Sequence, residues 1–334
     1  MIETDIKALN ERIQSESAFV DMLSMELSKI IVGQKHMLER LLIGLLSNGH
    51  ILLEGVPGLG KTMTVKTLAR ALGLSFNRLQ FTPDLMPADI VGTMMVVKSR
   101  TTGERVFRFQ KGPIFANVIL ADEINRATPK TQSAMLEAMA EGTVTVGGRT
   151  NPLDQPFIVL ATQNPLEMEG TYPLPEAQLD RFFFKILIEY PTKDELNTIV
   201  DRNITNQNIE IEKKTSAELV NRIKKTVRDV PIAQHVKEFA SKLILATQPS
   251  SKYAPQITKK YVSYGSSPRG LLTLVHGAKA RALINGRLNV SIDDIKAVAL
   301  PGLRQRIIVN FEGEAEGITS DYVVKEILKF SDNL

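Results

Sequence analysis

The sequence predicts an α/β protein in which a mostly parallel sheet has helices on both faces and is followed by an all-α domain. Two observations carry this prediction. Short apolar segments alternate with helical segments up to about residue 190, and helical periodicity dominates from there to the end of the 334-residue chain. We therefore expect N-terminal helices plus an αβα core over residues 1–190, and an α-helical domain over residues 191–334.

The first half of the chain begins with two helical patterns. Residues 4–30 carry apolar side chains at helical spacings, and a second helix is predicted to end near Ser47. Four short apolar runs then predict buried parallel strands, and helices are predicted between them. The strand candidates are residues 50–54, 76–81, 117–121 and 157–161, and the clearest helices among them are residues 61–72 and 130–141.

Two hairpins interrupt this alternation. Residues 94–98 and 105–110 flank a Thr102-Gly103 turn, and residues 143–146 face the segment before Phe157 across Gly147-Gly148. We interpret both as insertions into the core. A last strand is predicted over residues 182–188, and five helices follow, at residues 194–200, 217–227, 232–246, 268–285 and 292–299.

Composition excludes several classes of protein. The chain has no cysteine and only four scattered histidines, which argues against disulfides and against a zinc or iron–sulfur centre. The longest uncharged stretch, residues 41–53, is too short to span a bilayer. The charged N-terminus does not look like a secretory signal, so we expect a cytoplasmic protein without a membrane span. The formal net charge is only +4, a weak signal for nucleic-acid binding.

A Gly-rich loop carries the strongest chemical signal. Residues 55–62 match the pattern G-x-x-x-x-G-K-[ST] between an apolar strand and a helix, where backbone N–H groups can surround a phosphate chain. Lys61 is expected to contact the β- and γ-phosphates, and the Thr62 hydroxyl to ligate Mg²⁺. The alternative is an ordinary Gly-rich surface turn. The predicted nucleotide-binding residues of this segment are Gly55, Val56, Pro57, Gly58, Leu59, Gly60, Lys61, Thr62 and Met63.

Two acids follow a second apolar strand. Residues 118–121 are apolar and lead directly into Asp122 and Glu123. The strand would deliver both carboxylates to the sheet edge at which α/β proteins bind ligands. Asp122 is expected to hold Mg²⁺ through water, and Glu123 to orient and deprotonate an attacking water. A solvated strand end is the alternative, but a second acid beside a phosphate-binding loop favours hydrolysis of a nucleoside triphosphate.

With these motifs in place, the chain resembles the AAA+ ATPases, and among them the MoxR family. The resemblance covers roughly residues 30–270, and several separate blocks occur in the family's order. The blocks are residues 31–34 (IVGQ), 55–62, 120–127 (LADEINRA), 132–141 (QSAMLEAMAE), 161–165 (ATQNP), 174–182 (LPEAQLDRF) and 267–269 (SPR).

The resemblance implies roles for residues outside the two motifs. Asn164 matches sensor 1, which positions water against the γ-phosphate, and Arg181 matches the arginine finger that reaches a neighbouring subunit's nucleotide. Arg269 matches sensor 2, through which the helical lid reads the γ-phosphate. Ile31 and Val32 would line the adenine pocket. Each position also has an alternative without a functional role. Asn164 could belong to an ordinary turn, Arg181 could pair with an acid on the surface, and Arg269 could simply start a helix. Ile31 and Val32 could be core residues.

The same resemblance implies a function. It predicts an Mg²⁺-dependent ATPase that assembles as a ring, with a hexamer expected, and that remodels a protein client in a chaperone-like way. It also implies a partner that bears a von Willebrand factor A domain. Three alternatives stay open: a nucleic-acid motor, a magnesium-chelatase-type subunit, and a nucleotide-gated scaffold with little turnover.

The hairpins bear on the nucleic-acid alternative. Around the first turn lie the basic residues Lys98, Arg100, Arg105 and Arg108, whereas the second tip offers only Arg149 and has no aromatic stacking platform. We therefore do not expect nucleic acid to be the partner.

Overall fold

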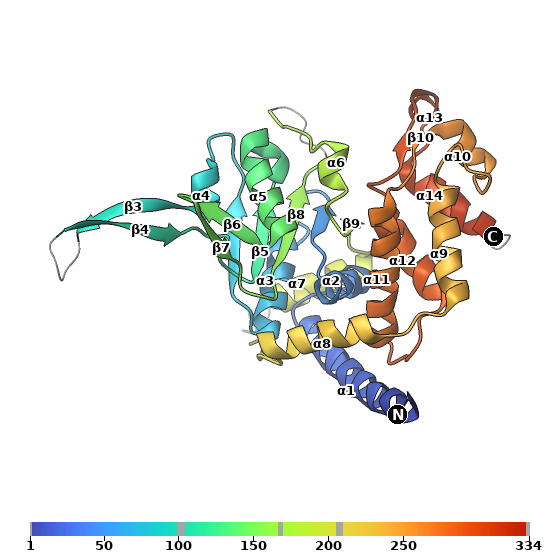
Figure 1. Ribbon diagram of the computed structural model, residues 1–334, viewed down its shortest axis with the longest axis horizontal. Helices are drawn as coiled ribbons and strands as arrows, with labels where there is room; N and C mark the ends of the chain where they lie inside the picture. Colours follow the sequence, from blue (N-terminus) through green and yellow to red (C-terminus); the bar gives the residue numbers. More distant parts are fainter. Residues whose placement is uncertain (1, 99–103, 166–169, 205–209, 332–334) are drawn as a thin grey trace.

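The computed structural model describes residues 2–98, 104–165, 170–204 and 210–331. An α/β core is followed by a helical lid, as the sequence predicts (Figure 1). The predicted turn at Thr102-Gly103 and the basic residue Arg100 lie outside the described residues.

The core is built on one parallel sheet. Its strands are β1 (Ile51–Glu54), β2 (Phe76–Gln80), β5 (Val118–Asp122), β8 (Ile158–Gln163) and β9 (Phe184–Leu187), in the order β2-β5-β8-β1-β9. Every neighbouring pair is parallel. All carboxyl ends therefore share one edge of the sheet, and all amino ends share the opposite edge.

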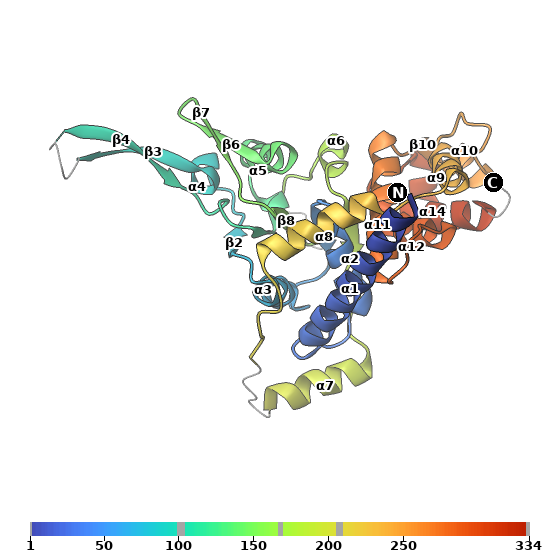
Figure 2. The same cartoon turned by 60° about the horizontal axis from the view of Figure 1, so that its bottom comes forward.

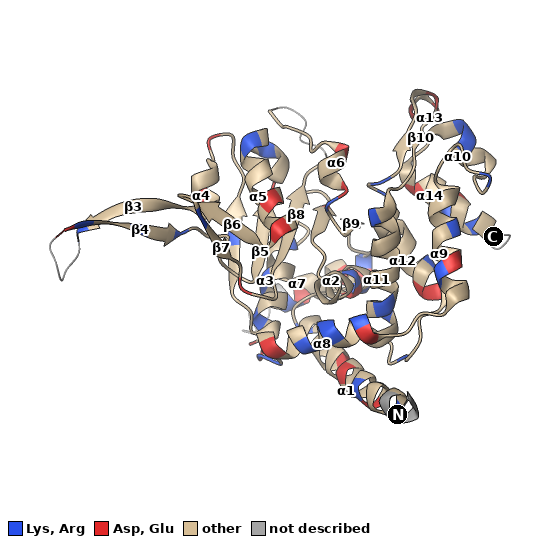
Figure 3. Cartoon of the chain, in the orientation of Figure 1, with Lys and Arg blue, Asp and Glu red and all other residues tan. Residues whose placement is uncertain are grey.

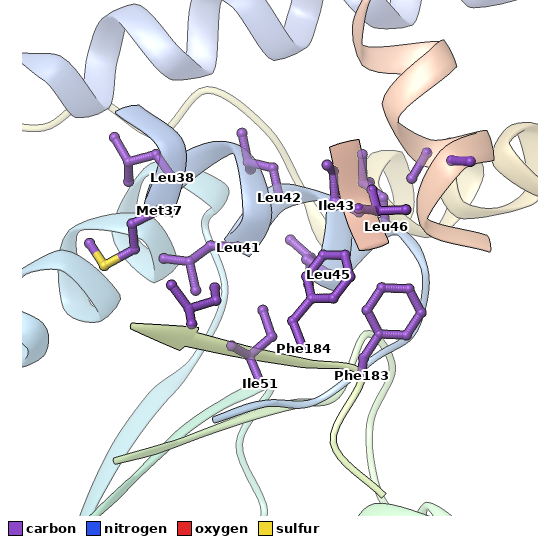
Figure 4. Close-up of a cluster of buried hydrophobic side chains, with 14 of the residues drawn as sticks. Met37, Leu38, Leu41, Leu42, Ile43, Leu45, Leu46, Ile51, Phe183 and Phe184 are labelled. Carbon is purple, nitrogen blue, oxygen red and sulfur yellow. The ribbon is translucent and has the colours of Figure 1, made fainter. Parts of the chain in front are cut away.

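Successive strand residues point to opposite faces of the sheet, which explains the continuous apolar runs. Ile51 and Leu120 belong to the larger of two hydrophobic clusters, whereas Leu52 and Ile119 belong to the other. Figure 4 shows part of the larger cluster, where Leu41 of α2 (Lys35–Leu46) lies above Ile51. These positions are fully or almost fully buried, so the sheet is fixed by packing on both faces.

Helices cover both faces. On the side of the larger cluster lie α1 (Ile2–Ser28), α2 and α3 (Lys61–Leu72); on the other lie α4 (Pro87–Val91) and α5 (Pro129–Glu141). Helix α5 begins with a proline, which fits the first helical position, and it ends before Gly142. The short α6 (Glu176–Leu179) and the 3₁₀ turn η1 (Ile124–Arg126) complete the core.

Both predicted hairpins are present. Strands β3 (Gly92–Lys98) and β4 (Arg105–Lys111) form an antiparallel ribbon that projects far from the core, as Figures 1 and 2 show. The second hairpin joins β6 (Thr143–Val146) to β7 (Arg149–Pro152). Each is a separate two-stranded sheet, so both are insertions beside the main sheet.

The chain after β9 is mostly helical. Its helices are α7 (Lys193–Ile204), α8 (Ala217–Asp229), α9 (Gln234–Ala246), α10 (Gln256–Tyr261), α11 (Pro268–Ile284), α12 (Ile292–Leu303), α13 (Phe311–Ala315) and α14 (Ser320–Phe330). Sequence periodicity did not predict the short antiparallel ribbon of β10 (Val262–Tyr264) and β11 (Ile308–Val309). Strands this short carry too little pattern to be detected. Within the described residues, no helix has both the length and the apolar character needed to cross a bilayer.

Candidate active site

The Gly-rich loop lies at the carboxyl edge of the sheet, between β1 and α3. Gly58 and Gly60 have φ values of 86° and 73°. Residues other than glycine rarely adopt such positive φ values, so the turn of the loop requires glycine at both positions. The loop leads into the N-terminus of α3, whose first N–H groups have no partner within the helix. Such a terminus favours a negatively charged group.

A cavity of about 270 Å³ opens beside this loop. It unites residues from four separate segments of the chain at the carboxyl edge of the sheet. Its lining consists of Pro57, Gly58, Leu59, Gly60, Lys61, Thr62, Met63, Arg78, Asp122, Glu123, Thr162 and Asn164. The cavity therefore brings together the predicted loop, both predicted acids and Asn164, which follows β8.

Lys61 turns back on its own loop in this structure. Its ammonium Nζ donates a hydrogen bond to the carbonyl oxygen of Gly55. Burial lowers the pKa of Lys61, while the nearby carboxylates of Asp122, Glu123 and Glu54 act in the opposite direction. The ammonium thus lies among acids at the floor of the cavity, where it can meet a phosphate.

Asp122 is fixed by donors on both of its carboxylate oxygens. Thr162 Oγ1 donates to Oδ1 at 2.6 Å. Arg78 donates to Oδ2 from Nε at 3.0 Å and from Nη2 at 2.6 Å. Strands β2 and β8 both flank β5, which explains why these two side chains meet Asp122. The carboxylate is therefore held in one orientation at the carboxyl end of β5.

Glu123 sits on a backbone that is unusual for a non-glycine residue, with φ 56° and ψ 50°. Its N–H donates to Thr162 Oγ1 at 2.8 Å. Its Oε2 accepts hydrogen bonds from Gln80 Nε2 at 2.8 Å and Arg126 Nη1 at 3.0 Å. The carboxylate of the predicted base is therefore already engaged by two donors in this structure.

The oxygen donors of the cavity suit a small hard cation. Thr62 supplies a hydroxyl and Asp122 a carboxylate, and Mg²⁺ prefers oxygen ligands. Across the described residues, no group of three or more His, Asp or Glu could hold a metal ion by itself. The side chains present therefore fit a metal that takes its remaining ligands from phosphate oxygens and water.

A second cavity of about 240 Å³ adjoins the first. The two share Gly58, Leu59, Gly60 and Met63 in their linings. Ile31 and Val32, which the family resemblance assigns to the adenine pocket, line the second cavity together with Pro191 and with Ile199 of α7. An apolar compartment next to a phosphate-binding loop fits a planar base.

Arg181 and Arg269 lie elsewhere. Arg181 comes three residues before β9, at the amino edge of the sheet, and its Nη1 donates to the carbonyl oxygen of Leu136 at 3.1 Å. Arg269 Nη1 lies 3.5 Å from Asp180 Oδ2. Both arginines line a third cavity of about 500 Å³, and neither lines the cavity of its own loop. The resemblance placed Arg269 at the γ-phosphate, but within one chain the structure keeps it at the opposite edge.

Comparison with known proteins gives the family. The profile of the ATPase family associated with various cellular activities (AAA) matches residues 50–184, and that of the AAA lid domain matches residues 254–327. Chaperone MoxR1 of Mycobacterium tuberculosis is 40% identical over 96% of this chain and 83% of its own length. The chain belongs to the MoxR family of AAA+ ATPases. YeaC of Bacillus subtilis is 42% identical over 90% of this chain and 91% of its own length.

A crystal structure from Cytophaga hutchinsonii has the same fold. It is 43% identical, covers 97% of this chain and 98% of its own, and superposes with a TM-score of 0.89. Membership of the MoxR family implies, in general terms, ATPase activity and the binding of a nucleotide with a metal.

Sequence reasoning missed four side chains of this MoxR-family site. Arg78 and Gln80 lie on β2, Arg126 lies in η1, and Thr162 lies on β8. The sequence gives only a weak signal for Arg78. Its position two residues before the end of a strand indicates that it lies near the carboxyl edge of the sheet, and nothing more. Which strand lies beside β5 is decided by the sheet order, and no local pattern shows that order.

Proposed function

We propose that this protein is an Mg²⁺-dependent ATPase that works as a ring, expected to be a hexamer, and remodels a protein client in a chaperone-like way. One observation carries the proposal. Lys61, Asp122, Glu123 and Asn164 meet in one cavity, while Arg181 lies at the far edge of the sheet. In this proposal the cavity binds ATP, and a second copy supplies the predicted finger Arg181.

The residues of the cavity have distinct tasks in this proposal. The backbone N–H groups of the loop and the Lys61 ammonium bind the triphosphate. Thr62 and Asp122 would hold Mg²⁺, Asp122 through water, and the ion would supply positive charge to the phosphates. Glu123 orients a water and takes its proton, and Asn164 fixes the position of that water. Ile31 and Val32 pack against the adenine.

The sheet itself argues for a shared site. Strand β9 has four residues. At about 3.3 Å per residue, the amino and carboxyl edges of the sheet are therefore roughly 13 Å apart along β9. Arg181 and Arg269 lie at the amino edge, away from the nucleotide of their own chain. In the proposed ring they face the nucleotide of a neighbour. Two guanidinium groups on one surface suit the charge of a transferring phosphoryl group.

Client remodelling is proposed from the fold and from the relatives. A relative with 40% identity is named a chaperone. The β3–β4 ribbon carries the exposed apolar side chains Val96, Val106 and Phe107, which a nucleotide-driven movement of the core would carry with it. By resemblance, a partner with a von Willebrand factor A domain would choose the client. A cytoplasmic location remains part of this proposal.

Turnover and binding can be separated by two variants. With Mg²⁺ and ATP, Glu123→Gln should bind ATP with wild-type affinity and lose at least about a hundredfold of the hydrolysis rate, because the base is gone. Lys61→Ala should lose ATP binding itself. Calorimetry measures the binding, and release of inorganic phosphate measures the rate. A wild-type protein that binds ATP tightly without turnover would instead be a nucleotide-gated scaffold.

The shared site is tested by mixing subunits. Arg181→Ala and Lys61→Ala chains should each be inactive, and a mixture should regain activity, since an intact Lys61 site can then receive an intact Arg181. The same experiment with Arg269→Ala tests its role at the neighbour's nucleotide. Mixtures that stay inactive at every ratio would contradict the contribution from a neighbour.

A further inference from the structure

A basic cavity lies apart from the loop, where the end of α2 meets α8 and α11. Its volume of about 360 Å³ falls in the range of small-molecule sites, roughly 300–1,000 Å³. Three of its lining side chains, Lys224, Arg228 and His276, are basic and none is acidic. The remaining lining residues are Leu46, Ser47, Asn48 and Val227. Figure 3 shows the Lys and Arg segments along α8.

Lys224 occupies a position that an apolar residue would normally take. It lies on the buried side of α8 with Val220, Ile223 and Val227, and only 8% of it is exposed. Its Nζ donates to Asn48 Oδ1 at 2.5 Å. In the described part of the chain, no ion pair joins Lys224 to a carboxylate. A buried ammonium without a negative partner costs several kcal/mol, so the site holds uncompensated charge.

The surroundings disfavour the positively charged form of Lys224. Burial, and secondarily Arg228, lowers the pKa of Lys224 to about 8. Burial, Lys279 and Arg228 lower the pKa of His276. The charged or titratable groups around Lys224 are Arg228 and Asp229 on α8, His276 and Lys279 on α11, His50 before β1, and Glu16 on α1.

The two acids among these groups are directed to other partners. Glu16 accepts a hydrogen bond from Thr226 and lies 3.5 Å from Arg222. Asp229 lies 3.6 Å from Arg12 of α1. Neither lines the cavity. Among the described residues, no carboxylate therefore balances the Lys224 ammonium, and an anion bound in the cavity would do so.

We propose that the basic cavity binds a phosphate group, held by the Lys224 ammonium and the Arg228 guanidinium. A tetrahedral anion can accept from several converging donors, and bonds to charged donors are the stronger ones. The lining has only two apolar residues, Leu46 and Val227, which disfavours an apolar ligand. The phosphate can be free orthophosphate or the phosphate ester of a small molecule. The proposal does not rest on hydrolysis at the loop.

The test uses the full chain with Lys61→Ala, so that the Gly-rich loop does not compete for the anion. Orthophosphate and glycerol phosphate are titrated separately by calorimetry, and thermal unfolding confirms that each variant is folded. We expect binding of at least one of them, and Lys224→Met should weaken it about tenfold or more. Arg228→Ala, at an exposed position, should weaken it several-fold. Lys225→Met, on the exposed side of the same helix, should bind as the parent does.

Comparing the affinities for the two ligands also distinguishes free phosphate from a phosphate ester. Tighter binding of orthophosphate indicates the free ion, and tighter binding of glycerol phosphate indicates an ester. The proposal is overturned if neither binds, if Lys224→Met binds as tightly as the parent, or if sodium chloride of equal ionic strength reproduces the thermal shift.

Proton uptake gives a second readout that a purely structural lysine would not show. At pH 8 about half of the Lys224 side chains are neutral, and a bound anion should return them to the ammonium form. Calorimetry at pH 8 in two buffers of different ionisation heat should therefore show uptake of protons with phosphate. Lys224→Arg should retain binding and lose this uptake. Identical uptake in the parent and in Lys224→Arg would contradict the contact.

Discussion

At the scale of single residues, the structure shows that buried polar groups have fixed partners and hence fixed protonation. His50 is the clearest case. Its Nδ1 accepts a hydrogen bond from the Val159 N–H at 2.9 Å, so Nε2 carries the proton and donates to the Met139 carbonyl oxygen at 3.0 Å. Burial lowers the pKa of His50 to about 4. The neutral imidazole is therefore part of the core.

This histidine predicts a loss of stability in mild acid. Between pH 6.5 and 4 the unfolded chain binds a proton at His50 that the native chain does not, so stability falls as pH is lowered through that range. The loss amounts to about 3 kcal/mol. Urea unfolding should show that His50→Gln loses less stability than the wild type between pH 7 and 4. Parallel curves for the two proteins would show that His50 is not the group that titrates.

At the scale of elements, helix ends are defined by side chains as well as by backbone. Ser291 caps the N-terminus of α12: its hydroxyl accepts from the Asp294 N–H, while the Asp294 carboxylate accepts from the Ser291 N–H at 3.0 Å. Asp294 is fully buried and also pairs with Arg281 at 2.7 Å and with Arg287. One carboxylate thus joins α11, α12 and the loop between them.

Removing that carboxylate should destabilise the lid. Burial alone would raise the pKa of Asp294, but hydrogen bonds from Arg287, Ser291 and Arg281 lower it overall. Its stabilising effect is therefore present at neutral pH and lost only in strong acid. Asp294→Ala should cost about 3 kcal/mol in chemical unfolding, because two guanidinium groups and a helix cap lose their partner. Exposed Asp293→Ala, the matched control, should change stability by less than about 0.5 kcal/mol. Equal effects of the two changes would refute this role.

At the scale of the whole molecule, the parallel sheet places two chemically different surfaces at its two edges. The carboxyl edge holds the loop and the acids, and the amino edge holds Arg181 and Arg269. A single copy cannot join these surfaces, whereas the proposed ring of copies would join every pair. In that proposal, assembly and catalysis depend on each other.

Assembly should therefore depend on nucleotide. With Mg²⁺ and ATP, Glu123→Gln should shift towards a larger species in light scattering, because the uncleaved γ-phosphate lies between Lys61 of one copy and Arg181 of the next. Adding Arg181→Ala should reduce that shift. Lys325→Ala, at an exposed position on α14, serves as the control and should leave it unchanged. A mass that does not change with nucleotide would argue against this coupling.

Local sequence was sufficient to locate much of the fold and of the site. Helix α3 begins and ends where the pattern placed it, at Lys61 and Leu72, because Gly60 and Gly73 have the positive φ values that end helical periodicity. The two acids at the end of β5 were predicted because a change from apolar to charged residues marks the end of a buried strand. Gln80 and Arg126, which bind Glu123, were not found, because no spacing in the sequence links them to it.

By itself, the order of amino acids determined the strands of the main sheet, most of the longer helices and the phosphate-binding loop. Backbone conformation and apolar periodicity depend on neighbours along the chain, and the sequence contains these directly. Only the tertiary structure decided that Arg78 fixes Asp122, that Arg269 lies far from its own loop, and that Lys224 faces a cavity. These contacts join residues distant in sequence, and they follow from strand order and helix packing, to which no local pattern corresponds.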